Sequence, residues 1–364
     1  MRVAVAGAGA FGKNHLRVYR ELETAGLGVA LAAAVEPDAA RAAEAEAKYA
    51  IPVFATLDEL LAAQRNASLK LDAATVAVPT VRHREVASAL LEAGLDLLVE
   101  KPLAASLAEA DELIFLAARH NRILQPGHLE RFNPAVLAVQ PQLRRPMFFE
   151  SHRLSVFTPR SLDVDVVLDL MIHDLDIVLV FAASEVREVR AVGLPILSPK
   201  VDIANVRVEF ESGCVANFTA SRASTERVRK LRFFEPRQYV SIDYARQDVL
   251  AISVNGACGA ASLPPEIQAA LASGKADPML PAKLAQAGVS GSAPGLTFAK
   301  PPVTPGEPLR LEILSFLDSV RTRRRPRVTA EQGRGALALA LEIQAAMAAH
   351  ACRAGLQDFF ERGA

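Results

Sequence analysis

A glycine pattern near the start of the chain constrains the fold more than any other feature. Residues 7–12 read Gly-Ala-Gly-Ala-Phe-Gly, directly after the apolar run 2–6 and before a helical pattern over 12–25. In a turn from a strand into a helix, this G-x-G-x-x-G spacing lets the backbone turn tightly, approach a pyrophosphate and pack the helix closely on the strand. The free N–H groups at the start of that helix favour bound phosphate. We therefore predict a dinucleotide site whose contacts are Gly7, Gly9, Ala10, Phe11 and Gly12.

The first 125 residues alternate short apolar runs with longer helical patterns, an order typical of parallel strands joined by right-handed crossovers. Thr56 and Glu59 have the spacing of a capping box, which predicts the start of a helix. The fold class that follows is α/β, with an N-terminal Rossmann domain, a doubly wound parallel sheet, over 1–125. Further strands are expected at 29–35, 74–78, 95–99 and 123–126, and helices at 38–49 and 56–63.

A second domain is expected after residue 125. Residues 148–156 and 206–210 alternate apolar with polar side chains, which is typical of half-solvated antiparallel strands. We predict a C-terminal α+β domain with an open, mostly antiparallel sheet over 126–330, followed by a helix over 331–364 that packs back on the Rossmann domain. Nine of the 22 prolines lie within 264–308, which favours an irregular arm or a partner-contacting surface.

Composition excludes several other classes of protein. The chain has 364 residues, 41 basic and 41 acidic, so no global field recruits nucleic acid or an anionic membrane. The apolar stretch 336–351 contains Glu342 and Gln344 and is interpreted as a packed helix, so no membrane association is expected. Three widely separated cysteines do not form a disulfide framework, which favours a cytoplasmic protein.

The expected second strand ends at Glu36, 24 residues after Gly12. A carboxylate at this place can accept hydrogen bonds from the adenosine ribose, and it repels a 2'-phosphate. The following Pro37 and Asp38 supply no adjacent cation. The sequence therefore predicts NAD in preference to NADP, with a solvated strand-end glutamate as the alternative.

Two further strand ends carry polar side chains. Ligands of open α/β sheets lie outside the carboxyl ends of the strands, and a lysine at a buried strand end is rare unless it is paired or functional. The first of these ends reads VPTVRH over 78–83, and the second reads VEKP over 99–102. The predicted cofactor contacts there are Pro79, Thr80, His83, Glu100 and Lys101.

In the second domain, Asp169, His173 and Asp176 recur at spacings of four and three, which places them on one helix face. A histidine beside carboxylates can take a proton from a hydroxyl while a carboxylate holds its ring. A structural histidine remains the alternative. The H-x-x-D spacing also fits a metal site, but no third ligand is evident, so no metal is expected.

A basic cluster, Arg321–Arg327, follows a helical pattern over 309–320. We interpret it as cations that complement the C-terminus of a helix, with an anion site as the alternative.

Taken together, these motifs resemble the glucose-fructose oxidoreductase / inositol dehydrogenase family, often called Gfo/Idh/MocA. The marks are GAGAFG, VPTVRH, EKP at 100–102 and D-x-x-x-H-x-x-D at 169–176. The resemblance implies a second-domain sheet that covers the nicotinamide and mediates homo-oligomerisation, and hydride transfer between a sugar or cyclitol carbon and the nicotinamide. It also implies that Lys101 hydrogen-bonds the reacting hydroxyl, that His173 is the acid/base and that Asp169 positions the substrate or the histidine. Met171 departs from the pattern, since a glycine often stands there.

A narrower resemblance, carried by GHLERFNPA at 127–135 and DLMIHDLD at 169–176, is to bacterial UDP-N-acetylglucosamine 3-dehydrogenases. It implies a 3-keto nucleotide sugar made for a pyridoxal-phosphate (PLP) aminotransferase in lipid A biosynthesis. Arginine suits diphosphate recognition. Dehydrogenation of a free sugar or inositol and a non-catalytic NAD-binding regulator remain alternatives, and an ordinary interdomain connection remains one for 127–135. The predicted substrate-side residues are Arg131, Asn133, Arg153, Arg160 and Asp176.

Overall fold

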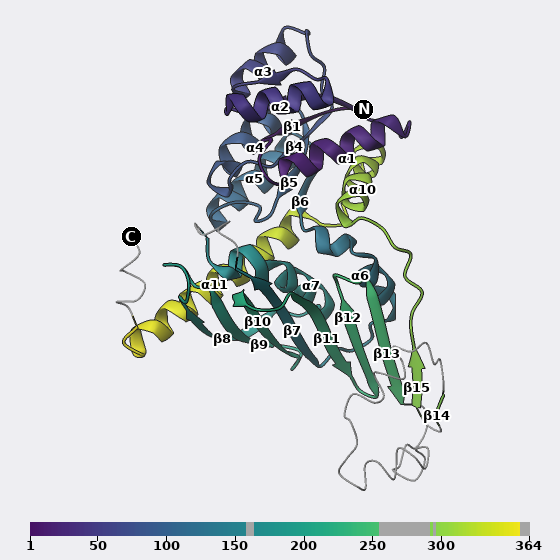
Figure 1. Cartoon of the computed structure of the whole chain (residues 1–364), viewed down its shortest axis with the longest axis vertical. Helices are drawn as coiled ribbons and strands as arrows, with labels where there is room; N and C mark the ends of the chain where they lie inside the picture. Colours follow the sequence, from purple (N-terminus) through teal and green to yellow (C-terminus); the bar gives the residue numbers. More distant parts are fainter. Residues whose placement is uncertain (158–163, 255–291, 294–295, 357–364) are drawn as a thin grey trace. The chain divides into compact units, whose positions relative to one another are not determined.

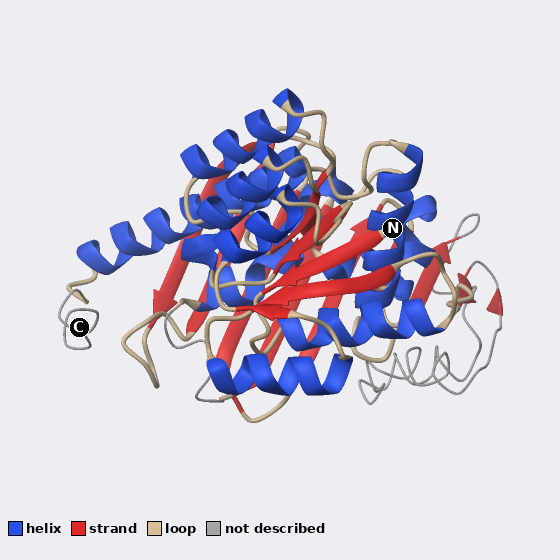
Figure 2. Ribbon diagram, turned by 90° about the horizontal axis from the view of Figure 1, so that it is seen from above, coloured by secondary structure: helices blue, strands red, loops and turns tan. Residues whose placement is uncertain are grey.

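The computed structural model describes residues 1–157, 164–254, 292–293 and 296–356. The chain divides into two compact units (Figure 1). Unit 1 contains residues 1–132 and 306–339, and unit 2 contains residues 133–305 and 340–364. Each unit is built around one sheet with helices packed against it (Figure 2).

The sheet of unit 1 has six strands in the order β3-β2-β1-β4-β5-β6, and every pair is parallel. This is the predicted Rossmann sheet, in which the direction of strand addition reverses between β1 and β4. The crossover rule therefore places the carboxyl ends of these two strands beside the glycine turn. The strands are β1 Arg2–Ala6, β2 Ala30–Val35, β3 Val53–Phe54, β4 Ala73–Val76, β5 Asp96–Glu100 and β6 Leu124–Gly127.

Among the helices of unit 1, α1 packs with α2 and α10, and α4 packs with α5, whereas α3 contacts β3. Thr56 and Glu59 form the predicted capping box at the start of α3, each side chain bonding the other residue's backbone. The helices are α1 Gly12–Thr24, α2 Ala39–Tyr49, α3 Leu57–Arg65, α4 His83–Glu92, α5 Leu107–Arg119 and α10 Pro308–Thr322, with short 3₁₀ turns η1 Thr80–Arg82 and η2 Leu129–Phe132.

Helix α10 belongs to unit 1 although it follows the second sheet in the sequence. Ile313, Phe316 and Leu317 are fully buried and join the core formed by β1, β2 and α1, where they meet side chains such as Leu16 and Tyr19. Their spacing of three and four puts them on one helix face. The boundary expected at residue 330 differs from this division, because the apolar face of α10 completes the core of the first unit.

The sheet of unit 2 has nine strands in the order β14-β15-β13-β12-β11-β7-β10-β9-β8. Strands β7 and β10 pair in parallel, while the other pairs among the described strands are antiparallel, which confirms a mixed, mostly antiparallel sheet. The strands are β7 Phe148–Val156, β8 Val186–Leu194, β9 Ile203–Phe210, β10 Val215–Ser224, β11 Val228–Glu235, β12 Gln238–Asp243, β13 Asp248–Val254, β14 Ser292–Ala293 and β15 Leu296–Ala299.

The alternation of apolar and polar residues in the sequence predicts which face of the second sheet is buried. Along the first half of β7, half-buried and buried residues alternate, and Phe149 on its buried face packs against Phe233 of β11. The remaining elements of unit 2 are α6 Pro134–Val139, the 3₁₀ turn η3 Gln140–Gln142, the π-helical turn η4 Val167–Met171 and α7 Ile172–Ala182.

Helix α11, Ala330–Arg353, contributes residues to both units. It is the one helix in the described part of the chain that is long and apolar enough to cross a membrane, by length and composition alone. Gly333 lies against Pro126, and Met347 lies against Gly193 of β8. These close contacts within the two units account for the small and apolar residues of α11. Most of the predicted Pro-rich arm, 264–291 and 294–295, lies outside the described residues.

Candidate active site

Each glycine of the turn between β1 and α1 is required for a different reason. Gly7 has φ +95°, and a Cβ there would lie 2.6 Å from the carbonyl oxygen of Ala77. A Cβ on Gly12 would overlap the carbonyl oxygen of Gly7, whereas a Cβ on Gly9 would meet nothing within 4 Å. Open space above the middle glycine is what a closely approaching pyrophosphate requires.

The N-terminus of α1 is also suited to an anion. Phe11 at the N-cap position makes no side-chain capping bond, and the first turn of the helix holds no acidic residue. Ala10 and Phe11 are exposed, so backbone and ring are accessible to a ligand. The unsatisfied N–H groups and the helix dipole favour phosphate there, so the residues present fit a dinucleotide.

The carboxylate of Glu36 accepts more hydrogen bonds than its position after β2 suggests. Its carboxylate is 3% exposed; Oε2 accepts from the backbone N–H of Ala8 at 2.8 Å, and Oε1 accepts from the backbone N–H of Asp38 at 3.1 Å. Oε1 also accepts from Nη2 of Arg41 at 2.9 Å. The expectation that no cation stands beside Glu36 is therefore wrong. The first turn of α2 brings Arg41 back over the strand end, five residues along the chain.

His83 lies between two backbone carbonyl groups. It is 1% exposed, with Nδ1 at 2.9 Å from the carbonyl oxygen of Pro102 and Nε2 at 3.0 Å from that of Val78. Burial lowers the pKa of this imidazole, which favours the neutral ring, and a neutral ring donates to only one of the two carbonyl oxygens. The predicted contact of His83 with the cofactor stays a prediction. Pro79 is exposed and Thr80 half-buried at the start of η1, as a contact with a ligand requires.

Lys101 is half-buried directly after β5, at the carboxyl end of the Rossmann sheet. The neighbouring Glu100 is buried and turns toward α1, where its Oε1 lies 2.7 Å from Nε2 of His15. The carboxylate is thus used inside the domain, and its predicted contact with the cofactor stays a prediction. His15 was not predicted as a site residue. Its place three residues after Gly12, on the buried face of α1, is the signal in the sequence that could have found it.

In unit 2, Asp169 lies in the π-helical turn η4 and His173 in the first turn of α7. Both are half-buried, whereas Asp176 is 2% exposed and Met171 1% exposed. Asp169 and His173 are therefore more accessible than Asp176, whose predicted contact with the substrate stays a prediction. Single turns of π-helix are rare and frequently occur at functional sites.

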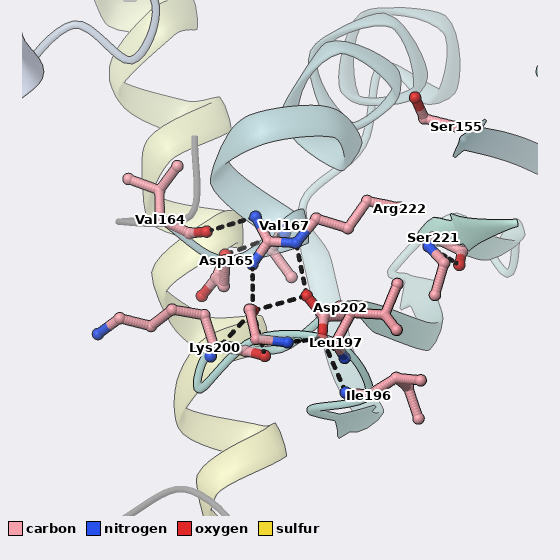
Figure 3. Close-up of polar contacts among 12 residues, drawn as sticks. Ser155, Val164, Asp165, Val167, Ile196, Leu197, Lys200, Asp202, Ser221 and Arg222 are labelled. Carbon is pink, nitrogen blue, oxygen red and sulfur yellow. Dashed lines mark hydrogen bonds and ion pairs between the residues drawn. The ribbon is translucent and has the colours of Figure 1, made fainter. Parts of the chain in front are cut away.

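A buried polar cluster fixes the segment that enters this turn (Figure 3). Nε of Arg222 donates to Oδ1 of Asp202 at 2.6 Å, and Nη1 donates to the carbonyl oxygen of Val164 at 2.9 Å. Asp165, the next residue, accepts the backbone N–H groups of Val167 and Leu168 at 2.9 and 3.0 Å. The start of η4 is therefore held from both sides.

Asp202 is the centre of this cluster. Its Oδ2 accepts three backbone N–H groups of the loop before it, from Ile196, Leu197 and Ser198. Burial opposes ionisation, but the hydrogen bonds from Ser198, Arg222 and the loop outweigh it and lower the pKa of Asp202 to about 2. A depressed pKa means that the ionised carboxylate stabilises the fold above the ordinary aspartate pKa, and that this stabilisation is lost as the pH falls toward about 2.

Arg153 is used within the fold. It is 3% exposed, its Nε and Nη2 donate to the two carboxylate oxygens of Asp174 at 2.6 and 3.1 Å, and its guanidinium lies 5.1 Å from the ring centre of Tyr244. A buried forked pair of this kind holds β7 to α7. The predicted contact of Arg153 with the substrate diphosphate stays a prediction, and it would have to form beside this pair.

Arg131 and Asn133 are also buried structural residues. Arg131 is 3% exposed, and its Nη2 donates to the carbonyl oxygen of Arg327 and to Oε1 of Gln332, both at 3.4 Å. Asn133 caps α6 and donates to the carbonyl oxygen of Tyr244 at 3.0 Å. These contacts lie within unit 1 for Arg131 and within unit 2 for Asn133, and both predictions of substrate contact stay predictions. Arg160 lies outside the described residues.

The basic cluster after α10 is occupied by contacts within unit 1. Arg321 donates to the carbonyl oxygens of Leu27 and Gly28, and Arg323 donates to Asp96 at 2.6 Å. These two arginines connect α10 to the loop before β2 and to β5, and not to the C-terminus of α10 as expected. Across the part of the chain that the structure describes, no group of three or more His, Cys, Asp or Glu residues could hold a metal ion.

Comparison with known proteins agrees with this arrangement. Residues 1–128 match an oxidoreductase family with an NAD-binding Rossmann fold, and residues 135–237 match the GFO/IDH/MocA C-terminal domain. UDP-N-acetylglucosamine 3-dehydrogenase of Acidithiobacillus ferrooxidans is 37% identical over 245 residues, which cover 67% of this chain and 74% of the relative. The chain belongs to the GFO/IDH/MocA family.

Other members of the family are similar over shorter stretches or in fold. Inositol 2-dehydrogenase of Leifsonia xyli is 32% identical over 197 residues, covering 52% of this chain and 56% of the relative. A solved structure of the Acidithiobacillus enzyme superposes with a TM-score of 0.80 at 31% identity, over 96% of this chain and 98% of that one. The protein is thus an oxidoreductase of a family of NAD-dependent sugar dehydrogenases, with an NAD(P)-binding Rossmann domain.

Proposed function

We propose that this protein oxidises a secondary hydroxyl of a nucleotide sugar with NAD, converting UDP-N-acetylglucosamine into its 3-keto form. The observation that carries the proposal is the 37% identity to a UDP-N-acetylglucosamine 3-dehydrogenase. Lys101 after β5 and a half-buried His173 on α7 add the groups that alcohol oxidation needs. The alternative is a free sugar or inositol, which the 32% identity to an inositol 2-dehydrogenase supports.

The chemistry assigned to the chain concerns one hydroxyl group. NAD supplies a hydride acceptor when it is bound. In the proposal, Lys101 donates a hydrogen bond to the reacting hydroxyl oxygen, and His173 takes the hydroxyl proton as the carbon–oxygen bond becomes a carbonyl. Asp169 positions the histidine or the substrate. A lysine at the oxygen stabilises the negative charge that develops there.

The proposal also places the protein in a reaction sequence. A 3-keto sugar is the substrate type that a PLP aminotransferase converts into an amino sugar, so such an enzyme is the proposed partner in the supply of lipid A or a surface polysaccharide. We further propose a cytoplasmic homo-oligomer formed through the second sheet, whose outward face is half-buried in the single chain.

A substrate panel tests the proposed function. With NAD in excess, UDP-N-acetylglucosamine should be oxidised at least about 100-fold faster, in kcat/KM, than free N-acetylglucosamine or myo-inositol, because binding of the remote nucleotide helps to position the reacting carbon. Absorbance of NADH at 340 nm is the measurement, with hydroxylamine present to trap the ketone.

The outcomes of the panel separate the candidates. Faster reaction of inositol or a free sugar than of every UDP-sugar would replace the nucleotide sugar with the alternative substrate class. NADH binding without turnover of any compound would leave a non-catalytic regulator.

The Glu36–Arg41 pair leads to a prediction on cofactor preference. NAD should bind more tightly than NADP, because in the proposal Glu36 carries its charge next to the adenosine ribose, but the neighbouring guanidinium partly offsets the repulsion of a 2'-phosphate. Arg41→Ala should therefore weaken NADPH binding more than NADH binding, and Glu36→Ala should do the reverse. Fluorescence titration of NADH and NADPH measures both ratios. Equal affinities of the unsubstituted protein for the two cofactors would contradict the role of Glu36.

A further inference from the structure

A buried histidine–carboxylate pair lies at the carboxyl end of β5 in unit 1. Residues 100–102, which contain Lys101, are called the lysine turn below. His15 is fully buried, Glu100 is 7% exposed, and Nε2 of His15 lies 2.7 Å from Oε1 of Glu100. Gly127 of the neighbouring strand β6 is pressed against the same carboxylate, since a Cβ there would lie 3.1 Å from the Cδ of Glu100. The carboxylate is thus confined between a helix and a strand, and the imidazole is its side-chain partner in this slot.

The other carboxylate oxygen faces the backbone of Lys101. Oε2 of Glu100 accepts the N–H of Lys101 at 3.3 Å, immediately before the peptide bond to Pro102. A buried carboxylate without a partner is costly, because its charge is removed from water. Loss of the histidine therefore removes the side-chain partner that holds Glu100 in this slot. We expect the carboxylate to move, which alters its hydrogen bond with the N–H of Lys101.

The same helix that carries His15 also carries the proposed phosphate site. His15 follows Gly12 by three residues, and its ring centre lies 6.0 Å from that of Phe11 at the N-cap position of α1. Nδ1 of His15 is buried and has no hydrogen-bond partner among the described residues. The ring is therefore anchored through Nε2, and this single bond joins α1 to the end of β5.

We propose that His15 is a positioning residue that acts through Glu100 to set the geometry of Lys101 and to link it to the cofactor-binding helix. This inference rests on the proposed role of Lys101 at the reacting hydroxyl. His15 lies outside the motifs from which the active-site residues were predicted. The alternative is that His15 only fills the space between α1 and β5, in which case its bulk matters and its hydrogen bond does not.

Two substitutions distinguish a positioning role of His15 from a packing role. His15→Leu keeps much of the side-chain bulk but removes the donor, and His15→Gln keeps an amide N–H that reaches the carboxylate. We expect His15→Leu to lower kcat about 100-fold, the effect of misplacing a reacting group by about 1 Å, with little change in the KM for NAD. His15→Gln should recover most of the lost kcat.

Tyr19→Phe is a matched control on the same helix. Tyr19 is fully buried on α1 and bonds Oγ1 of Thr75 at 2.8 Å, away from the lysine turn. Its loss removes a buried hydrogen bond of α1 and should lower the melting temperature while leaving kcat unchanged. Equal losses of kcat in His15→Leu and His15→Gln, or an equal loss in Tyr19→Phe, would reduce His15 to a packing residue and overturn the proposal.

A second readout does not depend on the substrate. Hydrogen–deuterium exchange of the Lys101 amide, measured by NMR with NADH bound, should be more than about tenfold faster in His15→Leu than in the unsubstituted protein, because the acceptor of that N–H has moved. His15→Gln and Tyr19→Phe should exchange at the original rate. Unchanged exchange in His15→Leu overturns the inference even where turnover is lost. Faster exchange in a protein that oxidises no sugar supports the link to Lys101 and refutes the proposed function alone.

Discussion

His173→Asn and Lys101→Ala should each lower turnover about 100-fold or more, with a much smaller effect on the binding of NADH. Asn keeps a polar side chain of similar width at position 173 but cannot take a proton from the hydroxyl. Ala at position 101 removes the hydrogen bond that stabilises charge on the reacting oxygen. Steady-state rates with the best substrate of the panel, together with calorimetric titration of NADH, measure the two effects separately.

His152→Asn is the matched control for the histidine. His152 is a half-buried residue of β7, in the same unit as His173 but on the sheet. It should retain near-normal turnover. A His173→Asn variant with near-normal turnover would remove that histidine from the mechanism, and a loss of NADH binding as large as the loss of rate would indicate a damaged fold in place of lost chemistry.

Local patterns predicted the elements of the fold well, because they depend on residues close together in the sequence. Strands β1 and β7 have the bounds that the apolar alternation indicated, and the capping box of α3 forms between Thr56 and Glu59 as expected. The glycine turn could also be predicted from the sequence, because the need for each glycine arises within one strand, one turn and one helix.

The partners of charged side chains could not be predicted, because the fold brings together residues that are not adjacent in the sequence. Arg153 was predicted to bind a diphosphate from its residue type and its place in the first strand of the second domain, whereas the fold also pairs it with Asp174. Glu36 was judged by its immediate neighbours, whereas a helical turn brings Arg41 to it. In both cases the sequence supplied the correct chemistry of the side chain, and only the tertiary structure supplied its partner.

The position of α10 shows the same limit at the level of domains. Its apolar face predicts a packed helix but does not say which core it joins. Phe316 is buried among residues of β1, β2 and α1, nearly three hundred positions earlier in the chain. Contiguous boundaries therefore could not describe unit 1.

Substitution of the glycines at the dinucleotide turn should separate binding from folding. Gly9→Ala adds a methyl group to open space at a backbone without positive φ, so the fold should be retained and the melting temperature should change little. The same methyl group occupies the space through which a pyrophosphate approaches the backbone. The dissociation constant for NADH should therefore rise at least about tenfold, equivalent to about 1.4 kcal/mol.

Gly12→Ala should behave differently, because its Cβ would overlap the backbone carbonyl of Gly7 and no flexible side chain can move aside. Helix α1 must shift from β1, so we expect the melting temperature to fall by about 4 °C or more and NADH binding to be lost with it. Thermal unfolding followed by circular dichroism and fluorescence titration of NADH measure both quantities on the two variants. Wild-type affinity in Gly9→Ala would show that no phosphate passes above the middle glycine, and the cofactor would then have to bind elsewhere than at the N-terminus of α1. A stable Gly12→Ala with weakened binding would instead mean that the turn can relax, so that the third glycine serves the ligand and not the packing of helix on strand.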